Sequence, residues 1–149
     1  MIDENDVIDA IFDKVIKTDA MIVEAATDFE IDRCNRDLYD IDCPPLPMGF
    51  VKFLKTANGF AWNGFEFFGT YNVKDKSSGY TLKDIVSCND NVSLPDGMVL
   101  LGGFDEDYYV YDYESMKYKS IDRLTQMDVE DFEDFTELIN GTVAVYALE

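Results

Sequence analysis

A break in helical structure, a short helix and an aromatic hairpin follow one another over residues 44–70, and this order constrains the fold most. The prolines within 44–47 end any preceding helix, because proline fixes φ and lacks an amide hydrogen. Residues 48–58 then place apolar side chains at helical spacing, and Gly59 supplies a C-terminal stop. Asn63-Gly64 lies between two aromatic runs and predicts a tight hairpin, because a type I′ turn needs positive φ at both central positions.

The remaining segments predict helices before this unit and an antiparallel sheet after it. Apolar residues recur at one-turn spacing over residues 7–16, which indicates an amphipathic helix, and a second, shorter helix is expected within 20–38. The other expected elements are a short helix within 80–87, strands at 98–101, 108–113 and 117–121 joined through 102–105 and 114–116, a helix capped by Asp128 that ends at Gly141, and a β-prone tail at 142–148. We therefore expect one α+β domain over residues 1–149, with a mostly antiparallel sheet and helices packed on one face.

The residue types needed for common catalytic sites are missing. The chain has no histidine, so no Ser-His or Cys-His pair can form within it. Gly102-Gly103 lacks the lysine of a phosphate-binding loop. The acids at 105–107, followed by Asp112 and Glu114, lack the spacing of an EF-hand loop, and a solvated acidic turn is the favoured interpretation. We expect a protein that is not an enzyme and binds no cofactor or metal.

The cysteines and the first residues of the chain favour a reducing compartment. Cys34, Cys43 and Cys88 are odd in number and irregular in spacing, which argues against a disulfide framework or a zinc site. The chain opens with acids where a secretory leader carries lysine or arginine. No apolar run approaches the roughly 20 residues of a membrane helix. We expect a cytoplasmic protein that does not enter membranes.

The charge balance is strongly acidic. Lysine and arginine number 12 and the acids number 31, which gives a formal net charge of −19. Such a surface repels nucleic acid and anionic membranes and speeds encounter with basic partners. Solubility alone is the simpler explanation, and an acidic surface kept for a basic protein is the alternative.

A tyrosine-rich strand next to acids is the strongest candidate for a contact surface. Alternation places Tyr109, Tyr111 and Tyr113 on one face of a strand over 108–113. These tyrosines have two explanations. They pack against a helix in the core, or they form a protein-binding surface in which the rings contact the partner and nearby carboxylates attract it. Trp62, beside the hairpin tip, has the same two explanations. The candidate contact residues are Trp62, Asp105, Glu106, Asp107, Tyr109, Tyr111 and Asp112.

Several short motifs resemble the SUKH superfamily over roughly residues 40–139. They are Leu46-Pro47, Phe53-Leu54, Asn58-Gly59, a strand that ends at Tyr111-Asp112, and an acidic closing helix. The chain departs from the family where Phe60 stands in place of a further glycine that often follows the Asn-Gly pair. The resemblance implies an α+β fold.

The resemblance also implies a function, because the superfamily takes in bacterial toxin-immunity proteins and yeast cell-wall-synthesis regulators. An immunity protein would bind a cognate toxin, and many such toxins attack nucleic acid through basic clefts that an acidic surface complements. The alternatives are a regulatory or scaffold module like the yeast regulators, and an acidic mimic of nucleic acid that blocks a DNA-binding protein.

Overall fold

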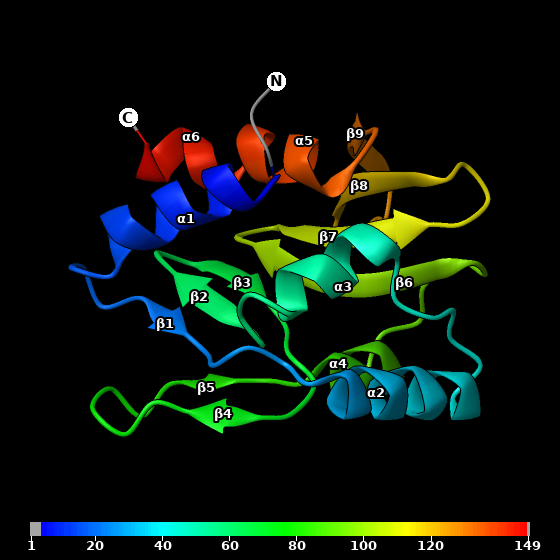
Figure 1. Cartoon of the computed structure of the whole chain (residues 1–149). Coiled ribbons are helices and arrows are strands. Elements are labelled where there is room, and N and C mark those ends of the chain that lie inside the picture. Colours follow the sequence, from blue (N-terminus) through cyan, green and yellow to red (C-terminus); the bar gives the residue numbers. More distant parts are fainter. Residues whose placement is uncertain (1–3, 149) are drawn as a thin grey trace.

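The computed structural model describes residues 4–148 and contains a seven-stranded antiparallel sheet in the order β1-β2-β3-β6-β7-β8-β9 (Figure 1). A separate β4–β5 hairpin lies beside it. The helices are α1 (Glu4–Val15), α2 (Asp28–Asp40), α3 (Met48–Leu54), α4 (Ile85–Asp90), α5 (Phe135–Gly141) and α6 (Val143–Ala147). The strands are β1 (Met21–Ile22), β2 (Phe60–Trp62), β3 (Phe65–Phe67), β4 (Val73–Lys74), β5 (Thr81–Leu82), β6 (Met98–Phe104), β7 (Asp107–Asp112), β8 (Lys117–Asp122) and β9 (Asp128–Phe132). The predicted single α+β domain with a mostly antiparallel sheet is confirmed.

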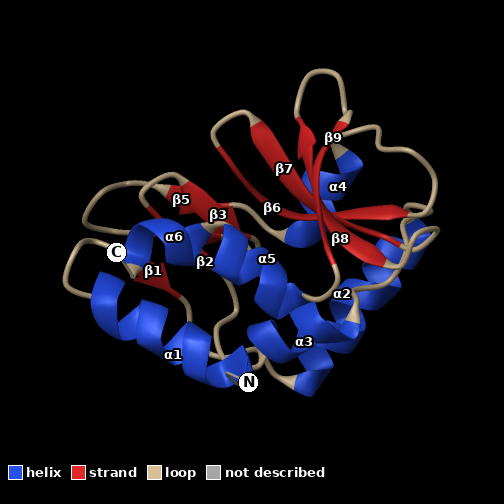
Figure 2. Cartoon of the chain, turned by 90° about the horizontal axis from the view of Figure 1, so that it is seen from above, coloured by secondary structure: helices blue, strands red, loops and turns tan. Residues whose placement is uncertain are grey.

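Most helices cover one face of the sheet, which we call the helical face. There α1, α3, α5 and α6 pack together (Figures 1 and 2). Their aromatic contacts reach the sheet through Phe67, whose ring lies 5.6 Å from that of Phe53 in α3 and 5.7 Å from that of Phe135 in α5. In addition to this predicted layer, α2, α4 and the β4–β5 hairpin lie on the opposite side of the sheet (Figure 1).

The predicted helix-to-hairpin unit forms, but its helix is shorter than the expected 48–58: α3 ends at Leu54 with Lys55 as its C-cap, so Gly59 does not end it. The β2–β3 turn has φ values of 51° at Asn63 and 88° at Gly64, as a type I′ turn requires. The strands pair Phe60 with Phe67 and Trp62 with Phe65, so their rings share the helical face. Phe60 stacks on Phe12 of α1 at 5.4 Å, which ties the hairpin to the N-terminal helix.

The C-terminal quarter differs from the sequence prediction. Asp128 does not cap a helix but begins strand β9, which pairs with the free edge of β8. The helix begins later, at Phe135, where the Asp134 side chain accepts the amide hydrogen of Glu137 at 2.9 Å. The predicted β-prone tail is also helical, because Val143, Ala144 and Ala147 bury one face of α6.

Two other boundaries are corrected. Residues 80–87 are not one helix: Thr81–Leu82 is strand β5, and α4 begins at Ile85 behind the cap Asp84. Strand β6 continues through both glycines of the predicted 102–105 link to Phe104, so the β6–β7 turn is only Asp105-Glu106.

Candidate functional site

The predicted tyrosine anchors lie in the core. Tyr109 and Tyr111 are 3% and 9% exposed and face the helices. The ring of Tyr109 stacks on that of Phe67 at 5.6 Å, and the ring of Tyr111 meets that of Tyr118 at 4.8 Å. Of the two explanations for these tyrosines, packing under a helix is the one that the structure supports, so neither ring is available as a surface anchor.

The predicted acidic contact residues are divided between the two ends of β7. Asp105 and Glu106 form the exposed β6–β7 turn, next to the half-buried Asp107. Asp112 lies at the far end and is buried, where it accepts the Glu114 amide at 3.0 Å. These four acids therefore do not form one surface, and Asp112 has a structural partner instead.

That partner is Lys119 of β8, a lysine whose side chain is only 10% exposed. Its Nζ lies 2.8 Å from Asp128, 3.5 Å from Asp112 and 3.9 Å from Asp131. The hydrogen bond to Asp128 is the main cause that raises the pKa of Lys119, while desolvation opposes it. The lysine thus stays charged and joins strands β7 and β8 to strand β9.

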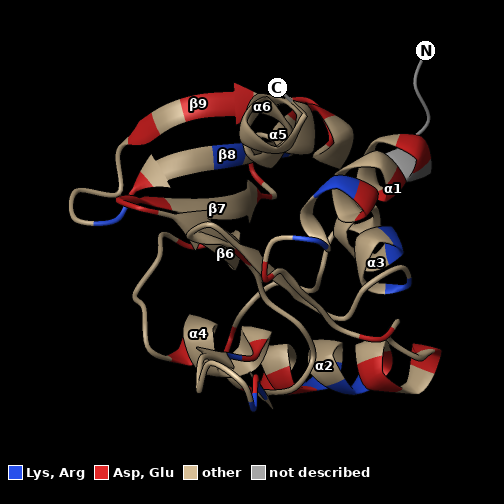
Figure 3. Ribbon diagram, turned by 90° about the vertical axis from the view of Figure 1, so that its left-hand side faces the viewer, with Lys and Arg blue, Asp and Glu red and all other residues tan. Residues whose placement is uncertain are grey.

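Strand β9 and the start of α5 form an acidic edge that sequence reasoning did not identify as a surface. Six of the ten residues at 128–137 are acids, and residues 128–131 are all exposed. In Figure 3 the ribbon of β9, at the edge of the sheet, is coloured as Asp or Glu over most of its length, and β8 beside it has a segment coloured as Lys or Arg. We define the acidic edge as Asp128, Glu130, Asp131, Glu133, Asp134 and Glu137. The acidic run is visible in the sequence, but because the segment was predicted to be a helix, the exposed edge strand was not recognised.

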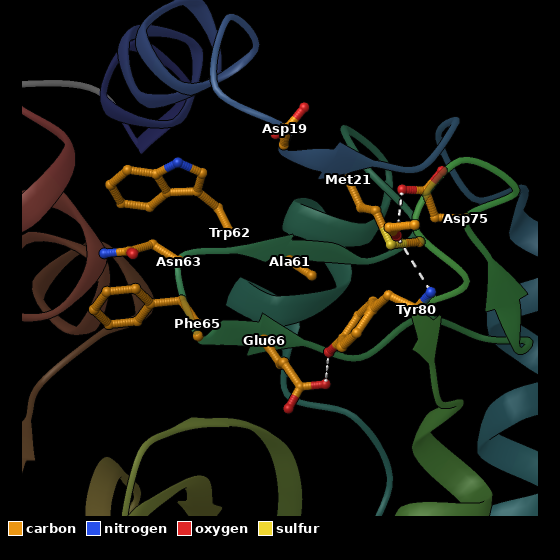
Figure 4. Close-up of a pocket in the computed structure, with 11 residues that line it drawn as sticks. Asp19, Met21, Ala61, Trp62, Asn63, Phe65, Glu66, Asp75 and Tyr80 are labelled. Atoms are coloured by element: carbon orange, nitrogen blue, oxygen red, sulfur yellow. Dashed lines mark hydrogen bonds between the residues drawn. The ribbon is translucent and has the colours of Figure 1, made fainter.

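A hollow of about 290 Å³ lies where the β4–β5 hairpin meets the sheet, and we call it the Glu66 hollow (Figure 4). It is lined by Asp19, Met21, Ala61, Trp62, Asn63, Gly64, Phe65, Glu66, Asp75, Ser78 and Tyr80. Figure 4 shows the Tyr80 hydroxyl directed at the Glu66 carboxylate, to which it donates a hydrogen bond. Burial, and secondly this hydrogen bond, raise the pKa of Tyr80, so the hydroxyl remains a donor.

Trp62 is the one predicted contact residue at this hollow. Its indole Nε1 donates to the Thr18 hydroxyl at 2.8 Å, and its ring is half-buried beside Phe65. The central pair, Glu66 and Tyr80, is 14 residues apart and comes from β3 and the loop before β5. No local motif contains both residues, so only the folded chain brings them together.

A second hollow of about 300 Å³ shares Glu66 and Tyr80 but carries the opposite charge. Lys83 and Arg123 line it, and the Arg123 guanidinium lies 4.8 Å from the centre of the Tyr108 ring. A Cβ added at Gly103 would lie 2.7 Å from Arg123 Nη2, so glycine leaves room for the arginine to fold back over the sheet. The Glu66–Tyr80 pair therefore lines both hollows, of which the Glu66 hollow is anionic and the second is mainly cationic.

The cysteines are protonated thiols in partly or fully buried positions. All three cysteines are free, and burial raises the pKa of Cys34 and Cys88 to about 12. Within residues 4–148, no group of three or more histidine, cysteine or acidic side chains is placed to hold a metal ion. No helix in the same span is long and apolar enough to cross a membrane.

The arrangement suits recognition of charged groups. No known protein-family model matches this chain, and a search of curated proteins finds no similar sequence. The site is therefore characterised by its own geometry: an acidic strand edge, and a carboxylate-lined hollow beside aromatic rings.

Proposed function

We propose that this protein is a non-catalytic binding protein that holds a basic protein partner. The acidic edge is the observation that carries this proposal. Exposed carboxylates on the last strand of a sheet repel a second copy of the same strand, which protects the edge from self-association. The same carboxylates attract a basic surface and speed its encounter.

We further propose that the partner is a toxin and that this protein is its immunity protein, as the SUKH resemblance implies. The net charge of −19 supports a partner with a basic cleft, such as a nuclease. Three free thiols support a reducing compartment such as the cytoplasm. A regulatory module like the yeast cell-wall regulators is the alternative. It predicts that the protein has no effect on the survival of cells that express the toxin.

The test is growth rescue from the C-terminal domain of a secreted protein encoded immediately upstream of this gene, and a metabolic operon at that position would favour the regulatory alternative. Co-expression of the wild-type protein should restore growth, and Glu130→Lys on the acidic edge should weaken rescue and slow association. Asp105→Lys with Glu106→Lys tests the β6–β7 turn in the same assay. Asp13→Lys makes the same charge change as Glu130→Lys at an exposed position on α1, and as the matched control it should leave rescue intact. Absence of rescue by the wild-type protein would contradict the immunity role.

A further inference from the structure

The Glu66 hollow combines three features that together select a cationic side chain. Asp19, Glu66 and Asp75 supply carboxylates, and none of the described residues that line it is lysine or arginine. Met21 and the Tyr80 ring supply an apolar wall for an aliphatic stem. We propose that this hollow receives an arginine side chain of the basic partner. This inference rests on the proposed function and deepens it.

Glu66 is positioned to accept further hydrogen bonds. Its Oε2 accepts a hydrogen bond from the Tyr80 hydroxyl, and no described residue donates a hydrogen bond to its Oε1. The residue is half-buried, so an incoming cation would meet a carboxylate that is partly shielded from water and held in place by a tyrosine. Guanidinium has a planar set of donors that matches such a carboxylate and also stacks on aromatic rings, which favours arginine over lysine.

Asp75 adds a second charge to the lining, with Tyr80 between it and the Glu66 carboxylate (Figure 4). Its carboxylate accepts the Ser78 hydroxyl at 2.8 Å and the Ser77 hydroxyl at 3.0 Å. These hydrogen bonds, the one from Ser78 first, lower the pKa of Asp75, which keeps it ionised at neutral and mildly acidic pH. The volume of about 290 Å³ lies at the lower end of the range of small-molecule sites and accommodates one long side chain.

The experiment titrates ¹⁵N-labelled protein with N-acetyl-arginine amide and follows the amide shifts by NMR. We expect saturable shifts near Met21, Glu66 and Tyr80, with a Kd on the order of millimolar for so small a ligand. N-acetyl-citrulline amide has nearly the same shape without the charge, and it should not shift these residues. Equal shifts with both compounds would overturn the proposal, and this comparison needs no mutation.

Two variants separate this hollow from diffuse attraction by an acidic protein. Glu66→Gln should weaken binding about tenfold, because it removes the charge but keeps an acceptor for Tyr80. Asp13→Asn removes one negative charge from an exposed position on α1, outside the acidic edge and the hollow, and should leave the Kd unchanged. Equal losses in both variants would refute a defined arginine site. Failure of the arginine probe, with growth rescue intact, would reject this hollow and leave the proposed function standing.

Discussion

At the scale of single residues, a buried asparagine takes the place of a missing strand. Strand β3 ends at Phe67, so no strand within residues 4–148 pairs with β6 on that side at Leu100. Asn89 of α4 fills this position: its Oδ1 accepts the Leu100 amide at 2.7 Å, and its Nδ2 donates to the Leu100 carbonyl at 2.9 Å. An amide side chain offers the same donor and acceptor as a backbone peptide, which satisfies both groups.

Replacement of Asn89 should therefore be costly. Asn89→Ala leaves two backbone groups of Leu100 buried and unpaired, and we expect the free energy of unfolding to fall by about 2–4 kcal/mol. Urea denaturation measures the change. Asn91→Ala, two residues further on and exposed, is the control and should stay within about 0.5 kcal/mol of wild type. Similar losses in the two variants would show that the Leu100 contacts are dispensable.

At the scale of elements, β9 is a short edge strand that is held by contacts with β8 and β7. It pairs with β8 on one side, and Lys119 joins it to the end of β7 through Asp112. Lys117, two residues earlier on β8, makes a more exposed ion pair with Glu133 at 3.3 Å. The two lysines let the buried and the exposed ion pair be compared on one strand.

Lys119→Met should lower the free energy of unfolding by about 3 kcal/mol, because it leaves the buried Asp112 without its cation. Lys117→Met should cost less than about 1 kcal/mol, since water screens the exposed pair. Chemical denaturation of both variants under one buffer gives the comparison. A Lys119→Met variant as stable as wild type would mean that the carboxylates around it need no counterion.

At the scale of the whole molecule, the charge opposes the compact state. A net charge of −19 on 149 residues produces repulsion that added salt screens, with a Debye length of about 10 Å at 0.1 M. We therefore expect the Tm to rise as NaCl increases from about 20 to 500 mM, as measured by calorimetry. The same rise in KCl would identify screening as the cause and exclude specific binding of sodium. A Tm that falls with salt would show that attractive ion pairs outweigh the repulsion.

The sequence by itself determined the parts of the fold whose signals are local. The proline break, the start of the helix at Met48 and the Asn63-Gly64 turn were predicted because φ restrictions and apolar spacing act within a few residues. The three-strand meander followed from β-rich runs with short links. Of the surface features, the acidic composition and the position of Trp62 beside the hairpin could be predicted.

Only the tertiary structure decided the C-terminal elements and the candidate site. Residues 128–132 became a strand because β8 offered a free edge, and residues 143–147 became a helix because α1 offered an apolar surface. Glu66 and Tyr80, like Lys119 and Asp112, meet only after distant strands have paired. Local propensity is weaker than the burial and strand pairing that neighbouring elements supply. A segment whose sequence is compatible with both helix and strand therefore adopts the one that its tertiary contacts stabilise.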